Sequence, residues 1–222
     1  NNIAPDLYLT NFVYNRLDEG ETFLHDYSKT YKPNRLLMWE DLANPTNDDF
    51  FMMHMFVYKL EVLKQTNLKL LEHTFYVDNQ YVYEPLYYVK NMYYLPIPLY
   101  QYYCGHADQS VSIANMKKNF MHDMRVYEKV CMRYTYEDFG KLSKAHRKHM
   151  LFALVVNAAL ALFYSVAARK QGGKKALKAI NKRFKKENGK LYRKLKWRTR
   201  FVLNTILFVP SIKNFDISTI FE

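Results

Sequence analysis

In the first half of the chain, runs of β-branched and aromatic residues alternate with polar segments, a pattern that predicts strands. Residues 6–14 and 22–27 form two such runs on either side of an acidic turn, so together they predict a hairpin. Residues 50–58 and 91–103 predict two more strands, and two prolines confine the middle of the second to a sheet edge or a bulge. Short helical segments are predicted at residues 39–42, 60–66 and 78–89.

In the second half, apolar residues recur every three or four positions, which predicts helices. The expected helices are residues 112–134, residues 142–168 and, after two consecutive glycines, a single basic amphipathic helix over residues 174–200. The apolar stripe of that last helix consists of Leu177, Ile180, Phe184, Leu191, Leu195 and Trp197. The sequence therefore predicts an α/β part with a mixed sheet over residues 1–110, followed by an α-helical, strongly basic region over residues 111–222.

Composition excludes several classes of protein. The chain has 222 residues, of which 49% are hydrophobic and 17% aromatic, so it can bury a core and is not a disordered protein. It contains only Cys104 and Cys131, which excludes a disulfide framework and a zinc-binding cysteine motif. No signal peptide is visible at the first residues, and the low cysteine content favours a reducing compartment, so we expect a cytoplasmic location.

The net charge of +12 is unevenly distributed along the chain. Residues 1–140 carry 13 Lys and Arg and 18 Asp and Glu, a net charge of −5, whereas residues 141–222 carry 20 and 3, a net charge of +17. A basic region of this kind favours an anionic partner: a membrane surface, a nucleic acid or a phosphorylated substrate. Residues 174–200 suit a cationic face on anionic lipid at the inner surface of the membrane. No nucleic-acid-reading motif accompanies them, which disfavours nucleic acid.

Residues 150–168 carry no charge over 19 positions, close to the length of about 20 apolar residues that spans a bilayer. One asparagine, one serine and several alanines lower the hydrophobicity of this segment, and basic clusters flank both of its ends. The pattern favours the core helix of a helical bundle. An interfacial helix and a membrane-spanning helix are the two alternatives.

A series of motifs runs from residue 72 to residue 112. It reads EHTFYVDNQY at 72–81, PLYYVKN at 85–91, YYL at 93–95, LYQY at 99–102 and GHADQSVS at 105–112. The series resembles bacterial family 2 glycosyltransferases, which are inverting enzymes of the GT-A type, and the resemblance covers about residues 6–130. It implies the acceptor-side half of a catalytic domain that transfers a sugar from a nucleotide-sugar donor to a cell-surface polysaccharide or a lipid-linked acceptor.

The chain departs from the family in two respects. It has neither the D-x-D motif, whose carboxylates bind the divalent metal (Mg or Mn) that the donor diphosphate needs, nor a glycine-rich phosphate loop. The resemblance therefore implies a fragment that lacks its nucleotide-binding half, supplied in cis or in trans. We expect the fragment alone to be inactive and to bind no metal.

Asp78 is the candidate catalytic residue, because the resemblance places the family's general base at this position. In an inverting transfer, a carboxylate takes the proton of the acceptor hydroxyl while its oxygen attacks the anomeric carbon. The alternative is that Asp78 caps the helix that begins there.

Seven further residues are candidates for substrate binding, each with a structural alternative. His73 and Asn79 flank Asp78, and His73 could line the acceptor pocket or lie in a loop. Trp39 could pack on a sugar or serve as a hydrophobic anchor, and His54 could face the sugar or a metal or be a core residue. The other three are His106, Gln109 and Ser110, which lie in the 105–112 motif. Gln109 and Ser110 could contact phosphate or hydroxyl groups, and the alternative is a helix N-cap formed by Ser110 or Ser112. His106 replaces an arginine that is frequent in the family, and it is a weaker phosphate ligand than a guanidinium.

Overall fold

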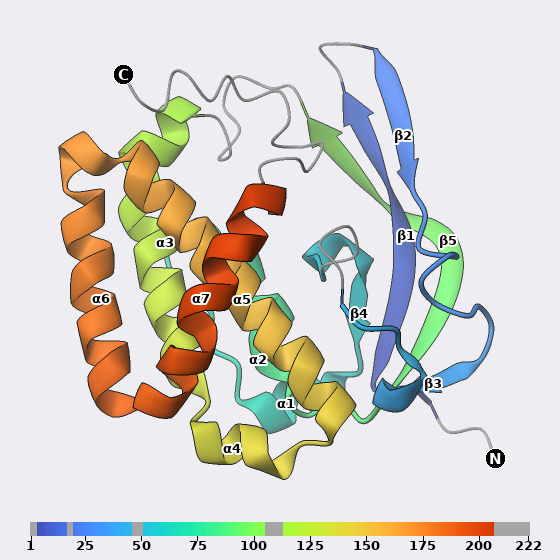
Figure 1. Cartoon of the computed structure of the whole chain (residues 1–222). Helices are drawn as coiled ribbons and strands as arrows, with labels where there is room; N and C mark the ends of the chain where they lie inside the picture. Colours follow the sequence, from blue (N-terminus) through green and yellow to red (C-terminus); the bar gives the residue numbers. More distant parts are fainter. Residues whose placement is uncertain (1–3, 17–19, 46–50, 105–112, 207–222) are drawn as a thin grey trace.

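The computed structural model of the chain describes residues 4–16, 20–45, 51–104 and 113–206 (Figure 1). It is mixed α/β, with a curled sheet on one side and helices packed on the other. The strands of the sheet are β1 (Leu7–Arg16), β2 (Glu21–His25), β3 (Leu36–Met38), β4 (Phe56–Tyr58) and β5 (Asn91–Cys104). The helices are α1 (Leu60–Thr66), α2 (Asp78–Leu86), α3 (Ile113–Arg133), α4 (Tyr136–Lys141), α5 (Lys144–Ala167), α6 (Gly173–Glu187) and α7 (Gly189–Ile206).

The sheet has the strand order β2-β1-β5-β3, and β4 also pairs with β1. The predicted hairpin is confirmed, because β2 runs antiparallel to the second half of β1, while β4 runs antiparallel to its first residues. On its other edge β1 pairs with β5 in parallel. The register of this pairing shifts at Asn11 and Phe12, opposite Pro98 and Tyr100, so the bulge expected at the prolines is confirmed.

Two sequence predictions for the regular elements were wrong. Of the strand predicted over residues 50–58, the described part, residues 51–58, contains only β4, because Met53–Met55 forms a 3-10 turn before it. The single basic helix predicted over residues 174–200 is two helices, α6 and α7, which separate at Asn188, a residue with non-helical dihedral angles. The side chain of Asn188 explains the break, because it accepts a hydrogen bond from the Tyr136 N–H at 3.2 Å and donates one to the Tyr134 carbonyl at 3.0 Å.

Helix α5 lies at the centre of the helical layer and packs against α2, α3, α6 and α7. It is long and apolar enough to cross a membrane, the one such helix among the residues described. Most of its apolar segment is nevertheless buried against the rest of the protein. The core helix of a bundle passes the same test of length and composition as a membrane-spanning helix. Because α5 is mostly buried against other elements, its placement favours the core helix that the sequence suggested.

One continuous hydrophobic cluster joins the sheet to the helices. At their junction, the Trp39 ring stacks on the imidazole of His146 with ring centroids 4.0 Å apart, and its indole N–H donates to the Val89 carbonyl at 2.7 Å. His146 Nε2 is 2.8 Å from the Leu86 carbonyl, which ties the start of α5 to the end of α2. Buried side chains from residues 1–110 and 111–222 thus share this core, and the division at residue 110 stays a prediction.

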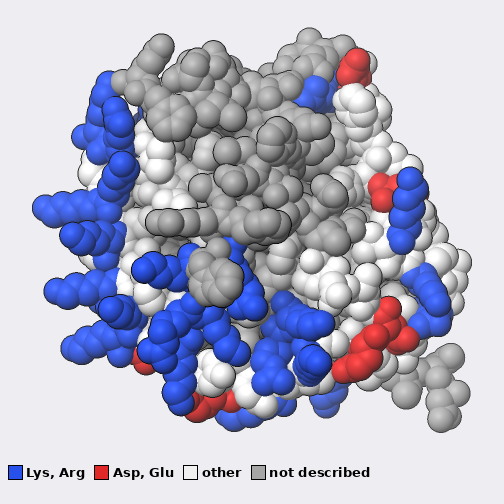
Figure 2. All heavy atoms as spheres, in the orientation of Figure 1, with Lys and Arg blue, Asp and Glu red and all other residues white. Residues whose placement is uncertain are grey.

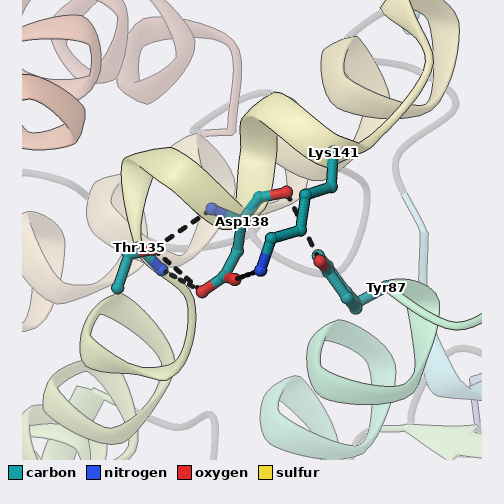
Figure 3. Close-up of polar contacts among 4 residues, drawn as sticks. All are labelled: Tyr87, Thr135, Asp138 and Lys141. Atoms are coloured by element: carbon teal, nitrogen blue, oxygen red, sulfur yellow. Dashed lines mark hydrogen bonds and ion pairs between the residues drawn. The ribbon is translucent and has the colours of Figure 1, made fainter.

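Helix α4, which the sequence pattern did not predict, is held by a capping box at its first turn (Figure 3). The Thr135 hydroxyl accepts from the Asp138 N–H at 3.1 Å, and Asp138 Oδ2 accepts from the Thr135 N–H at 3.0 Å. Lys141 donates to the same carboxylate at 2.8 Å, and the Tyr87 hydroxyl donates to the Asp138 carbonyl at 3.4 Å. The hydrogen bonds from Lys141 and Thr135 lower the pKa of Asp138 to about 2.

Candidate functional site

The turn that leads into α2 has an unusual backbone. His73 and Tyr76 adopt positive φ angles of 49° and 67°, a left-handed conformation that is uncommon for side chains of this size. The Phe75 N–H donates to Nδ1 of His122 on α3 at 3.1 Å, and the two rings lie 5.3 Å apart. Strained backbone of this kind is often found where a side chain must be held in one orientation. The turn therefore fixes the direction in which the first residues of α2 point.

Asp78 is the first residue of α2 and is half-buried. Val77 occupies the N-cap position and makes no side-chain capping bond, so Asp78 is not the N-cap residue, although its carboxylate accepts hydrogen bonds from N–H groups of the first turn. Burial raises the pKa of Asp78, and hydrogen bonds from the N–H groups of Asp78 and Asn79 act in the opposite direction. The neighbouring Asn79 directs its side-chain amide back to the Tyr76 carbonyl at 3.3 Å, which stabilises the turn.

A second carboxyl group, Asp123 of α3, is buried close enough to Asp78 to sense its charge. Burial is the main cause that raises the pKa of Asp123 well above its ordinary value, and the charge of Asp78 adds to it. Its Oδ2 has no hydrogen-bond partner among the described residues. Tyr164 of α5 packs against Tyr76 with ring centroids 4.9 Å apart, and both hydroxyls sense the two carboxylates. We call Tyr76, Asp78, Asp123 and Tyr164 the carboxylate site.

The sequence did not single out Asp123, although it held a signal for it. Asp123 lies within the apolar stripe of α3, between Phe120 and Tyr127 and next to Met124, all of which are buried. A carboxyl group on the buried face of a helix is costly unless something compensates for it, so its presence there is informative. What the sequence could not supply was the partner, because Asp78 and Tyr164 come from other helices.

Two of the other predicted site residues, Trp39 and His54, stack on rings of other elements than α2. Trp39 is 3% exposed and stacked on His146, a position that favours the anchor role. His54 is 8% exposed and stacks on the rings of Tyr100 and Tyr102, with a pKa that burial lowers to about 4, which favours a neutral core histidine. His73 is exposed in the turn before Asp78. The remaining predictions, His106, Gln109 and Ser110, lie outside the described residues.

Two cavities are lined by described residues, and Asp78 lines neither of them. One, of about 440 Å³, lies mainly along α3 and is lined by Leu71, Arg125, Glu128, Lys129, Met132 and Arg133. The other, of about 500 Å³, lies between α4 and α7 and is lined by Tyr136, Lys190, Arg193, Lys194 and Arg198. Neither cavity is therefore lined by the carboxylate site, in which Asp78 is half-buried at the first turn of α2 and Asp123 is buried on α3.

The described part of the chain contains no group of three or more His, Cys, Asp or Glu side chains that could hold a metal ion. The carboxylate site supplies two acids and two phenols, and each of these groups can hold or release a proton. The group with the less elevated pKa, Asp78, is the one that ionises first.

Comparisons with known proteins gave no match: no family model, no curated protein and no solved structure resembles this chain significantly.

Proposed function

We propose that the chain is the acceptor-side part of an inverting glycosyltransferase and that Asp78 is its general base. The observation that carries the proposal is the half-buried carboxylate at the first turn of α2, with a raised pKa and a neighbouring buried acid. In the reaction, Asp78 takes the proton of an acceptor hydroxyl as that oxygen bonds to the anomeric carbon. The bond from that carbon to the nucleoside diphosphate breaks, and the electron pair leaves with the diphosphate.

The environment of Asp78 suits this role. A base works best when its pKa is displaced toward the working pH, and burial displaces the pKa of Asp78 in that direction. Asp123, whose pKa is raised further, keeps its own proton and so leaves the negative charge on Asp78. The strained turn at His73 and Tyr76 is the kind of backbone that holds a reacting group in place.

The donor side of the reaction lies outside this proposal. A divalent metal and a nucleotide-binding half belong to the family that the sequence resembles, and the described residues offer no metal ligand set. We therefore assign to this chain the acceptor and its deprotonation only. The sugar and the acceptor stay undefined, with a polysaccharide or a lipid-linked glycan at the inner face of the membrane as the expected class.

The experiment expresses the complete open reading frame that contains these residues and measures sugar transfer from a panel of nucleotide sugars. Asp78→Asn keeps the shape of the side chain and removes the base. We expect it to lower kcat by roughly 100-fold or more, with little change in donor affinity. Asp26→Asn is the control for loss of a carboxylate elsewhere, since Asp26 is exposed, accepts hydrogen bonds from Ser28, Asn11 and Tyr94, and is distant in sequence from the site.

Two results would remove the proposal. Transfer at the wild-type rate by Asp78→Asn would exclude Asp78 as the base. Absence of both transfer and donor hydrolysis across the panel, in a protein that is folded by circular dichroism, would favour a second function, that of a non-catalytic binding or scaffolding module which docks on a membrane or a partner through its basic helices.

A further inference from the structure

A groove lined by positive charge lies between α4 and α7. Its lining consists of Tyr136, Lys190, Arg193, Lys194 and Arg198, and its volume is about 500 Å³. Four of the five lining side chains are cationic and none is acidic. All four cationic residues are exposed, whereas Tyr136 is half-buried and packs against the core. We call this feature the cationic groove.

The helical repeat brings the charges together. Lys190, Lys194 and Arg198 follow one another at intervals of four residues, so they share one face of α7. The ammonium groups of Lys190 and Lys194 lie 5.6 and 5.1 Å from the centroid of the Tyr136 ring, so both stand over the same aromatic side chain. Asn188 fixes this arrangement, because it bonds the start of α4 at the point where α7 begins.

The described part of the protein does not neutralise these charges. Within it, no ion pair joins Lys190, Lys194 or Arg198 to an acidic side chain, although Arg183 of α6 pairs with Glu128. Like charges four residues apart on a helix repel each other. A row of cations that costs stability and has no acidic partner among the described residues is expected to meet an external anion.

The groove belongs to a larger basic surface. Residues 169–200 contain fifteen Lys and Arg and one Glu, and Figure 2 shows these cationic side chains gathered over the helical side of the molecule. Helix α6 packs against α7, so its exposed lysines extend the charge beyond the groove. Positive charge thus extends over a wide area around the groove. A ligand surface that carries many anionic groups can interact with more of this charge than one small ion can.

We propose that the cationic groove binds the phosphate groups of anionic lipids and thereby docks α7 on a membrane surface. Tyr136 favours lipid over nucleic acid as the occupant. Its ring is half-buried and two ammonium groups lie 5.6 and 5.1 Å from its centroid, so it is not an open platform of the kind on which bases stack. The proposal does not depend on the proposed transferase activity, because none of the groove residues belongs to the carboxylate site.

The test measures co-flotation of the 222-residue chain with vesicles of phosphatidylcholine, with and without phosphatidylglycerol, at near-physiological ionic strength. We expect binding only with phosphatidylglycerol, and we expect it to weaken as salt is added. The triple variant Lys190→Gln, Lys194→Gln, Arg198→Gln should bind about 100-fold more weakly, since each basic residue near an anionic surface strengthens binding roughly five-fold. The matched control is Lys174→Gln, Lys178→Gln, Lys185→Gln on α6, which removes equal charge outside the groove and should weaken binding less than 10-fold.

Each alternative outcome overturns a part of the proposal. Equal losses in the two triple variants would show that diffuse charge, and not the groove, binds the vesicles. Equal flotation with both kinds of vesicle would remove the phosphate headgroup as the ligand. Millimolar inorganic pyrophosphate leaves the anionic bilayer itself unchanged. If it displaced the protein completely from the vesicles, the groove would be assigned to a soluble phosphate compound. Tighter binding to single- or double-stranded RNA than to the vesicles would assign it to nucleic acid.

Discussion

At the scale of single residues, Asp123 and Asp138 are two carboxyl groups whose pKa values are displaced in opposite directions. Burial raises the pKa of Asp123, so at pH 8 the unfolded chain is ionised there while the folded chain resists ionisation. The folded protein therefore has its full stability with respect to Asp123 below the unfolded pKa of about 3.9, and it loses stability as the pH rises. Asp123→Asn removes the carboxyl group and with it this loss of stability at high pH. We expect it to raise the free energy of unfolding at pH 8 by about 1 kcal/mol or more, and to have little effect at pH 4.

Urea denaturation at the two pH values measures this difference, and Asp138→Asn is its control. Hydrogen bonds lower the pKa of Asp138 to about 2, so this carboxylate stabilises the fold above pH 3.9 and loses its effect as the pH falls toward 2. Asp138→Asn should therefore destabilise the protein at pH 8. If Asp123→Asn were destabilising at pH 8 as well, Asp123 would have to be ionised and bound to a partner in the folded protein.

The residues of the candidate site differ in how far the sequence could predict them. Asp78 follows from the motif around it and from the helix that begins there. Asp123 and Tyr164 join the site only because α3 and α5 pack beside α2, and no local pattern encodes that packing. Trp39 and His54 have residue types that suit a sugar-binding site. Their burial, which decides against an open sugar-binding surface, depends on the tertiary fold.

At the scale of elements, Gly173 marks a close approach between α5 and α6. A Cβ atom at this position would lie 2.6 Å from the Ser165 carbonyl oxygen and 3.0 Å from that of Ala168, both of them backbone atoms that have little freedom to move. We expect Gly173→Ala to lower the free energy of unfolding by about 1–3 kcal/mol, through overpacking of the two helices. Gly189 begins α7 and has no atom within 4 Å of its Cβ position. Gly189→Ala should leave stability unchanged or slightly raised.

Thermal unfolding of the two alanine variants compares these expectations directly. Wild-type stability in Gly173→Ala would mean that α5 and α6 are farther apart than described. A loss in Gly189→Ala equal to that in Gly173→Ala would point to a general effect of alanine in the basic helices, and not to a close contact.

The elements that local pattern determines were predicted well, and those that depend on tertiary contacts were not. The hairpin, α1, α3, α5 and the bulge in β5 all follow from residue period and proline placement. The break between α6 and α7 was missed although Asn188 and Gly189 form a dipeptide typical of turns. The basic amphipathic pattern continues on both sides of it, and the bonds that make Asn188 leave the helix go to α4, which was itself not predicted.

At the scale of the whole molecule, the sheet and the helices are joined by aromatic rings and neutral histidines. His146 and His149, at the start of α5, pack against Trp39, and His54 packs between β1 and β5 on the rings of Phe12 and Tyr100. These contacts link segments that are up to about a hundred residues apart. The stability of the junction therefore depends on the histidines staying uncharged, and this makes the fold sensitive to acid.

That sensitivity can be measured. Burial lowers the pKa of His54, His146 and His149 to about 4 in each case, against about 6.5 in the unfolded chain. Above pH 6.5 both states are neutral at these positions. As the pH falls from 6.5 toward 4, only the unfolded chain takes up protons, so the free energy of unfolding decreases.

His54→Phe keeps an aromatic ring in the core and removes one titrating group. The decrease in the free energy of unfolding between pH 7 and pH 4.5 should therefore be smaller by about 2 kcal/mol in this variant. An identical pH dependence in His54→Phe and in the wild type would show that His54 takes up its proton as readily in the folded protein as in the unfolded chain. His54 would then not be a neutral member of the aromatic junction between sheet and helices.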